Sequence, residues 1–231
     1  MAPDWKLLYL YGGDSPWDSS LWTDSDDRVR GGKSQSHMHC ESPEKARFFG
    51  HLDITTLGAA GFASQRTLGT LHLDLRQYDG FVIRILESDS KKYTLTVKDE
   101  ILPPRDDGRD QSTISWEYDF VCDTGDVKIL WSDFKPTYRG KPKLDAKPLD
   151  LSSIKRISFM MRSFFGEQEG DFTLTVAHLA AISDRPTSPG SELSFEKDHA
   201  AVRAAARPPG AQSSWLSWIC GWALWLSIFL F

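Results

Sequence analysis

The stretch TDSDDRVRGGKSQS, residues 23–36, gathers acidic, basic, glycine and hydroxyl residues between aromatic-rich segments. Three kinds of chemistry use such residues. They are a glycine-rich phosphate cradle, a metal or acid–base site, and a shaped polar loop that braces a fold or holds a partner. Each kind needs its own spacing of residues, and the spacing can be compared with the sequence.

A phosphate cradle is not supported by the spacing. The run GGKS at 31–34 is similar to the end of a Walker A loop, which needs an earlier glycine five positions before the glycine that precedes the lysine. Asp27 occupies that position, and its carboxylate would repel a phosphate. The loop must also open a helix, but Pro43 interrupts the residues that follow. We therefore expect no nucleoside triphosphate site.

The sequence gives equally little support to a metal site or a catalytic site. His37 and His39 share one face of a strand and Cys40 points to the other, so only two imidazoles converge. Two ligands are too few for a zinc site, and polar residues on an exposed strand face are the favoured interpretation. The chain has no G-x-S-x-G nucleophile elbow. We predict no enzyme, no metal and no cofactor.

A shaped polar loop remains. Gly31 and Gly32 allow a positive φ or a close approach of the backbone. Their neighbours can form local ion pairs and short hydrogen bonds, and they are Asp26, Asp27, Arg28, Arg30, Ser34, Gln35 and Ser36. Two roles stay open: the loop braces the fold, or it carries a binding surface, as ordered loops on rigid scaffolds often do.

The segments that must position this loop alternate between apolar and polar residues. Period two predicts half-buried strands at 93–98, 114–120 and 172–176, and mixed strands at 47–54, 81–86 and 156–161. Glycine and proline turns separate them, and no amphipathic helix of useful length precedes residue 183. The pattern favours an all-β antiparallel sandwich or jelly roll.

Composition excludes some partners and compartments. The net charge is −5, so there is no basic field to gather nucleic acid. The cysteines are odd in number (Cys40, Cys122 and Cys220) and form no C-x-x-C pair, which favours a reducing compartment. The first residues match neither a signal peptide nor a transit peptide, so we expect no presequence.

The C-terminal part differs in composition. Residues 184–212 are rich in proline, serine and alanine and predict a linker with a possible short helix. Residues 213–231 carry no charge, and Trp215, Trp218, Trp222 and Trp225 form one helical stripe. Tryptophan favours the membrane interface, so we predict a tail that associates with a membrane. The alternative is a tail that folds back onto the sandwich.

The ordered blocks SDDRVRGGKSQS, FFGHLDI, GFASQRTL, LDLRQYDGFVIRI and ILWSDFKPTYRGK resemble the complex I intermediate-associated protein 30 family over residues 5–183. The resemblance implies a galactose-binding-like jelly-roll β-sandwich. It also implies a non-enzymatic, chaperone-like assembly factor that binds a protein partner, by analogy an assembly intermediate of mitochondrial complex I. The predicted tail and the expected lack of a presequence leave the outer mitochondrial membrane and the endoplasmic reticulum open as locations.

The resemblance also suggests binding positions in two loops. We assign to binding Asp27, Arg28, Gly31, Gly32, Ser34, Ser36, Asp133, Thr137 and Arg139. Phe134 is expected to pack under a sheet, and Pro136 and Gly140 to set a turn.

A carbohydrate-binding module is the alternative function. Sugars stack on exposed rings, so two or three coplanar rings at one rim would favour it. The candidate rings are Trp17, Trp22, Tyr78 and Tyr138.

Overall fold

The computed structural model describes residues 6–106 and 108–184, and these form two antiparallel β-sheets with only short 3₁₀ helices. The predicted all-β antiparallel class is therefore confirmed. The strands are β1 Lys6–Tyr11, β2 Trp22–Asp24, β3 Gln35–Ser42, β4 Lys45–Leu52, β5 Phe62–Thr67, β6 Gly80–Ser88, β7 Tyr93–Lys98, β8 Ser115–Phe120, β9 Gly125–Leu130, β10 Lys135–Tyr138, β11 Lys141–Pro142, β12 Arg156–Arg162 and β13 Gly170–Ser183. The 3₁₀ helices are η1 Ser19–Leu21, η2 Asp27–Arg30 and η3 Trp131–Asp133.

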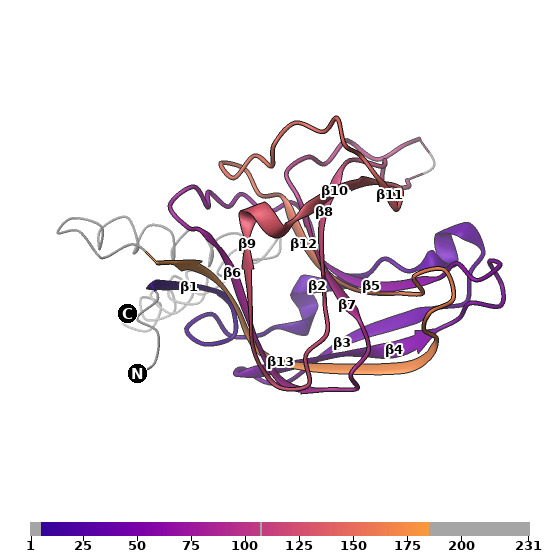
Figure 1. Cartoon of the computed structure of the whole chain (residues 1–231), viewed down its shortest axis with the longest axis horizontal. Coiled ribbons are helices and arrows are strands. Elements are labelled where there is room, and N and C mark those ends of the chain that lie inside the picture. The colour runs from indigo at the N-terminus through magenta and orange to yellow at the C-terminus, as the bar shows by residue number, and fades with distance from the viewer. Residues whose placement is uncertain (1–5, 107, 185–231) are drawn as a thin grey trace, which may run out of the picture.

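The first sheet has six strands in the order β3-β4-β13-β6-β9, and β1 also pairs with β13. The second sheet has seven strands in the order β11-β10-β8-β7-β12-β5-β2. In Figure 1, β3, β4 and β13 run side by side along the lower part of the molecule, whereas β10 and β11 lie at the upper side. The 14-residue strand β13 pairs with β4, β6 and β1 and so holds the first sheet together.

The core lies between the two sheets and is built from the predicted alternating residues. Tyr93, Leu95 and Val97 of β7 all point inward and are buried. The Phe48 ring of the first sheet lies 6.2 Å from the Tyr93 ring and 6.3 Å from the Phe159 ring of the second. Burying one such side chain contributes about 1.5–3 kcal/mol, so this shared aromatic cluster holds the two layers together.

Strand β5 shows why periodicity missed part of the second sheet. Its inward residues are Ala63, Gln65 and Thr67, and only the first is apolar. Its outward residues include Phe62, so the usual contrast between the two faces is absent. Pairing with β12 and β2, rather than its own pattern, makes this segment a strand.

Most of the C-terminal part predicted above lies outside the described residues. This holds for residues 185–212 of the predicted linker, with its short helix, and for the tail with Trp215, Trp218, Trp222 and Trp225. Within the described ranges, no helix combines the length and the apolarity needed to cross a bilayer.

Candidate functional site

The first motif is an internal brace built around Asp27. This carboxylate is fully buried and accepts hydrogen bonds from the Ser34 backbone N–H at 3.1 Å, the Ser34 Oγ at 2.7 Å and the Phe62 backbone N–H at 3.1 Å. Ser34 leads into β3 of the first sheet, and Phe62 begins β5 of the second. Asp27 therefore ties the two sheets together at one edge of the sandwich.

Asp26 makes a second tie beside the first. Its carboxylate accepts from the Ser36 Oγ at 2.6 Å, the Ser36 backbone N–H at 3.1 Å and the Ser64 backbone N–H at 2.8 Å. Burial raises the pKa of Asp26, although the hydrogen bonds from Ser36 and Ser64 act in the opposite direction. Gln65 completes the network by donating to the carbonyl oxygen and to the Oγ of Ser36.

The two glycines serve different purposes in this loop. Gly31 has a φ of +84°, which L-residues seldom adopt, and nothing lies near the place of a Cβ. Gly32 lies against the brace, because a Cβ there would come 2.2 Å from the Asp27 Oδ1. The side chain of Arg28 is half exposed and pairs with Asp24 and, at 3.4 Å, with Asp26.

The brace decides which predicted binding residues can reach a partner. Asp27, Ser34 and Ser36 use their polar atoms inside the fold, whereas Arg28 and Gly31 are exposed. Their burial indicates that Asp27, Ser34 and Ser36 brace the fold. The binding role of the motif stays a prediction, and any contact would fall to its exposed members.

The second motif lies at the opposite edge of the second sheet. Asp133 accepts a hydrogen bond from the Leu130 backbone N–H at 2.9 Å, and Phe134 is buried as expected. Thr137 is buried in β10, and Arg139 is exposed with a φ of +54° in the β10–β11 turn. The two motifs are thus on opposite edges, β2 and β11, and do not form one site.

Between these edges, the outer face of the second sheet forms a polar recess. Its cavity is about 130 Å³ and is lined by residues of β5, β12, β7 and β8, with Ser25 beside them. Ser64, Thr96, Glu117, Arg156 and Ser158 all point away from the core, yet each is less than 10% exposed. A solvated outer face would leave such residues exposed, so this face is hollowed.

Strand register assembles the recess from distant parts of the sequence. Ser158 of β12 pairs with Arg66 of β5 on one side and with Thr96 of β7 on the other, and Thr96 pairs with Glu117 of β8. These residues form one row across four strands. Arg156 stands directly opposite Lys98, which places two like charges at a cross-strand position.

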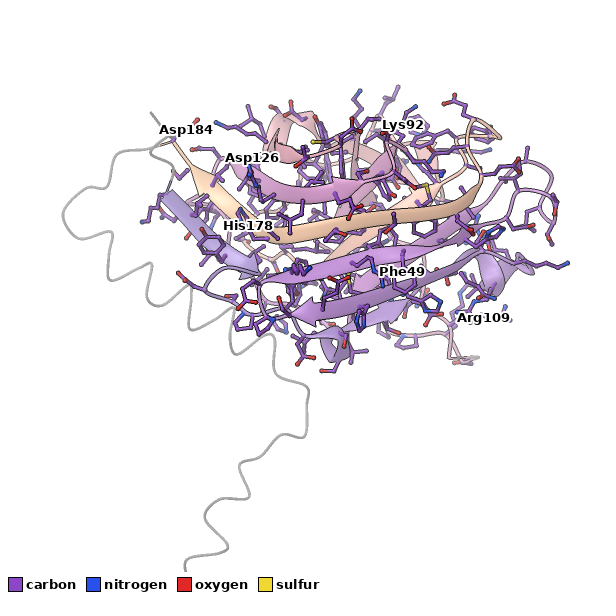
Figure 2. The ribbon with its side chains drawn as sticks, turned by 90° about the horizontal axis from the view of Figure 1, so that it is seen from below. Phe49, Lys92, Arg109, Asp126, His178 and Asp184 are labelled. Atoms are coloured by element: carbon purple, nitrogen blue, oxygen red, sulfur yellow. The ribbon has the colours of Figure 1, made fainter. Side chains whose placement is uncertain are left out.

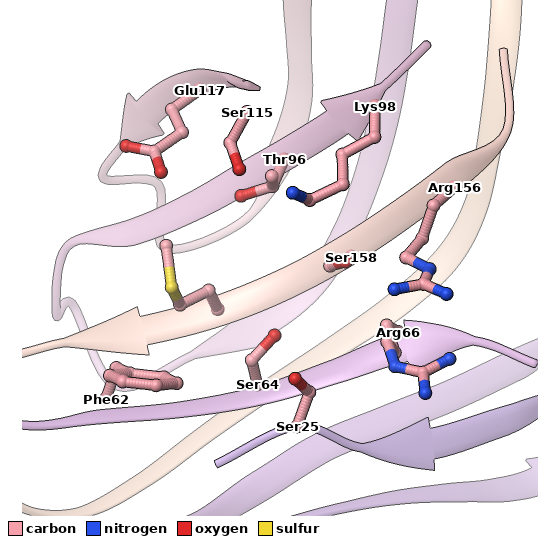
Figure 3. Close-up of a pocket in the computed structure, with 11 residues that line it drawn as sticks. Ser25, Phe62, Ser64, Arg66, Thr96, Lys98, Ser115, Glu117, Arg156 and Ser158 are labelled. Atoms are coloured by element: carbon pink, nitrogen blue, oxygen red, sulfur yellow. The ribbon is translucent and has the colours of Figure 1, made fainter. Parts of the chain in front are cut away.

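The recess is polarised from one end to the other. Figure 3 shows Lys98, Arg156 and Arg66 on one side of the close-up, and Glu117 and Phe62 on the other. At the Glu117 end, Arg162 donates to Glu117 at 2.7 Å and to Asp119 at 2.6 Å, so one positive charge serves two carboxylates.

The cationic end holds three positive side chains close to one carboxylate. Asp110, from the connection between β7 and β8, accepts a hydrogen bond from Arg156 at 2.7 Å and lies 3.6 Å from Arg66. Burial opposes ionisation of Asp110, but the hydrogen bond from Arg156 and the charges of Arg156, Arg66 and Lys98 outweigh it and lower the pKa. Burial, followed by the charge of Arg156, lowers the pKa of Lys98 to about 8.

The recess is equipped for binding through hydrogen bonds and charge. The Thr96 Oγ1 and the Arg156 Nε are buried and have no partner in the described part of the chain. The residues that line the recess include no histidine or cysteine. Among residues 6–106 and 108–184, no group of three histidine, cysteine or acidic side chains is placed to hold a metal ion.

Replacing Lys98 with methionine is expected to stabilise the protein by about 1–3 kcal/mol at pH 7, because the native state pays to bury a charge that the unfolded chain keeps in water. Lys98 has a lower pKa in the folded than in the unfolded state. The cost is therefore complete below pH 8 and declines as the pH rises toward 10.5. Urea unfolding at pH 7 and at pH 10 measures both effects. A loss of stability at pH 7 would contradict this interpretation.

His37 and His39 of β3 lie on the outer face of the first sheet, away from the recess. His37 and His39 are exposed, and Cys40 points toward the interior, as expected for a strand. The His37 ring lies 5.2 Å from the Phe49 ring, whose other neighbour is the guanidinium of Arg47. Figure 2 shows Phe49 on this face, on the strand that lies beside β13.

The four aromatic residues considered for sugar stacking do not form a platform. Trp17, Trp22 and Tyr78 are buried in the core, and only Tyr138 is exposed. The Trp17 indole N–H donates to the Ala177 carbonyl oxygen at 2.9 Å, and its ring stacks on Tyr11. These rings pack the sandwich from within.

Two antiparallel sheets, a buried brace at one edge and a recessed outer face define an all-β sandwich. The model of the Complex I intermediate-associated protein 30 (CIA30) family matches residues 12–176. The chain belongs to this family. An uncharacterized protein of Schizosaccharomyces pombe is 38% identical over 200 residues, which cover 83% of this chain and 91% of that protein.

Solved structures of similar shape include carbohydrate-binding modules. A family 11 module of a cellulosomal cellulase of Clostridium thermocellum gives a TM-score of 0.49 at 14% identity, covering 78% of this chain and 96% of that one. A family 11 module from the same organism, in complex with a β-1,3-1,4-mixed-linked tetrasaccharide, gives 0.49 at 14% identity, with 79% and 98% covered. Likenesses of this size do not bear on what this chain binds.

Proposed function

We propose that the protein is a non-enzymatic binding factor that holds a protein partner during assembly, and that the partner is an intermediate of respiratory complex I. Membership of the family described as complex I intermediate-associated carries this proposal. The recess supports a binding role, because it offers oriented donors and acceptors on rigid strands.

The proposal extends to the organisation of the whole chain. Residues 5–183 form the binding module, with the galactose-binding-like jelly-roll topology that the family resemblance implies. Residues 184–212 connect it to the apolar segment 213–231, whose tryptophans hold the module at a mitochondrial membrane. A factor kept at the membrane would meet membrane-embedded subunits as they assemble.

Affinity purification of the full-length chain from mitochondria and from crude membranes tests the proposal. We expect complex I subunits to be enriched among the bound proteins. A chain ending at residue 212 is the matched variant: it should leave the membrane fraction and still capture the same subunits from a detergent extract. Recovery of the full-length chain without any respiratory-chain subunit would contradict the proposed function.

A further inference from the structure

The cationic end of the recess places like charges side by side, although Lys98 also donates to the Thr113 Oγ1 at 2.9 Å and Arg156 donates to Asp110 at 2.7 Å. Arg156 and Lys98 are direct cross-strand neighbours, and like charges at such positions destabilise a sheet. Arg66 lies close enough for the charge of Arg156 to act on it, as the lowered pKa of Arg66 shows after the larger effect of burial. Asp110 is the acid that pairs directly with Arg156 and lies close to Arg66. The charges of Glu117 and Asp99 also act on Lys98, and that of Asp24 acts on Arg66.

We propose that this end of the recess binds a carboxylate side chain of the protein partner, between Arg66, Arg156 and Lys98, in the place that Asp110 now occupies. The inference rests on the proposed function, because it names the chemistry by which the partner is recognised. An acidic residue in an accessible segment of the partner would enter the recess, and the carboxylate of Asp110 would move into solvent.

The carboxylate of Asp110 occupies the proposed site from the rim of the recess, in the way that the carboxylate of a partner would. Its side chain is 46% exposed, whereas that of Arg156 is 10% exposed, so the cation belongs to the sheet and the anion sits at the rim. The Arg66 Nη2 lies 3.6 Å from Asp110, too far for a hydrogen bond. A carboxylate that entered more deeply would contact both guanidinium groups.

Two buried polar atoms of the recess are available for a further hydrogen bond. Within residues 6–106 and 108–184, neither the Arg156 Nε nor the Thr96 Oγ1 has a partner. The hydroxyl groups of Ser64 and Ser158 line the floor between Arg66 and Thr96. A buried polar group without a hydrogen bond destabilises the fold, and a bound carboxylate would remove part of that loss.

The size of the cavity restricts the ligand. About 130 Å³ is small beside ligand pockets of about 300–1,000 Å³. One aspartate or glutamate side chain fits this space, whereas a folded surface does not. The opposite end repels a second acid, because Glu117 and Asp119 share the single positive charge of Arg162 and leave that end negative.

Peptide binding to the full-length protein in detergent tests this inference. The probes are a fluorescein-labelled Gly-Ser-Glu-Glu-Ser-Gly peptide, the same peptide with two glutamines, and inorganic phosphate as competitor. We expect the glutamate peptide to bind at least about ten-fold more tightly than the glutamine peptide, since one desolvated charge pair contributes more than 1.4 kcal/mol. Phosphate at equal concentration should displace little of it.

Variants of the recess sharpen the test. Arg66→Gln and Lys98→Met should each weaken binding of the glutamate peptide by about ten-fold or more. Lys98→Met is expected to raise stability, so its loss of binding could not come from unfolding. Asp110→Asn should strengthen binding several-fold, because it removes the internal competitor. Arg84→Gln, an exposed arginine on the outer face of the first sheet, is the matched control and should change nothing.

Three outcomes would overturn the inference. They are equal binding of the two peptides, weaker binding by Asp110→Asn, and direct binding of phosphate with no binding of the glutamate peptide. The third would mean that the recess is a site for a free phosphate group. The carboxylate site can be wrong while the proposed function is right. If wild type and Arg66→Gln retained complex I subunits equally, the result would contradict the carboxylate site and leave the assembly role standing.

Discussion

Asp27→Ala is expected to lower the free energy of unfolding by about 3–5 kcal/mol, the largest effect of any single polar substitution in this fold. The buried carboxylate satisfies the backbone N–H and hydroxyl of Ser34 and the backbone N–H of Phe62. Its removal leaves the backbone N–H groups of Ser34 and Phe62 without this acceptor, and the Ser34 Oγ keeps only its 3.3 Å hydrogen bond to the Asp53 carbonyl oxygen. One of the two ties between the sheets is lost, and the tie at Asp26 remains.

Urea unfolding followed by tryptophan fluorescence measures this loss. Asp24→Ala, three residues earlier, is the control: its exposed pair with Arg28 should be worth less than about 1 kcal/mol. Asp27→Asn keeps the volume of the side chain but removes its charge and one acceptor. The amide group accepts through only one oxygen and turns an N–H₂ toward the remaining donors. Near wild-type stability of Asp27→Asn would show that the hydrogen bonds do not carry the brace.

Gly32→Ala is expected to cost about 2–3 kcal/mol, although alanine adds only one methyl group. The new Cβ would stand 2.2 Å from the Asp27 Oδ1, and the carboxylate cannot retreat without losing its hydrogen bonds. Gly31→Ala is the neighbouring control. It meets no atom and pays only for its φ of +84°, about 1 kcal/mol.

A double-mutant cycle links the two predictions. Gly32→Ala should cost much less in an Asp27→Ala background, where the carboxylate that it strikes is absent. Thermal or urea unfolding of the four proteins gives the coupling energy. Additive effects would mean that the close contact between Gly32 and Asp27 does not limit stability.

Residues 23–36 show which features of a loop can be predicted from residue types alone. Two adjacent glycines indicated a positive φ or a close approach, and the structure has one of each, at Gly31 and Gly32. The acidic residues were equally compatible with a surface loop and a brace. Their burial depends on β3 and β5, which approach from different sheets and whose positions the motif itself does not encode.

Alternation along single strands was sufficient for the fold class. Tyr93, Leu95 and Val97 reveal a half-buried strand because each side chain direction depends only on the adjacent residues. The same argument predicted that Thr94, Thr96 and Lys98 point outward, which they do. It could not show that this outward face is hollowed and buried.

The recess could not be found from the sequence. Arg66, Lys98 and Arg156 lie on strands far apart in the chain, and none belongs to a motif. Basic residues at the ends of polar strand faces were the available signal, but such residues are common on solvated surfaces. Periodicity is a local property, whereas pairing register and strand order arise from contacts between distant segments. Composition and alternation therefore determined an all-β chain with polar outer faces, and only the packed sheets decided where the positive charges meet.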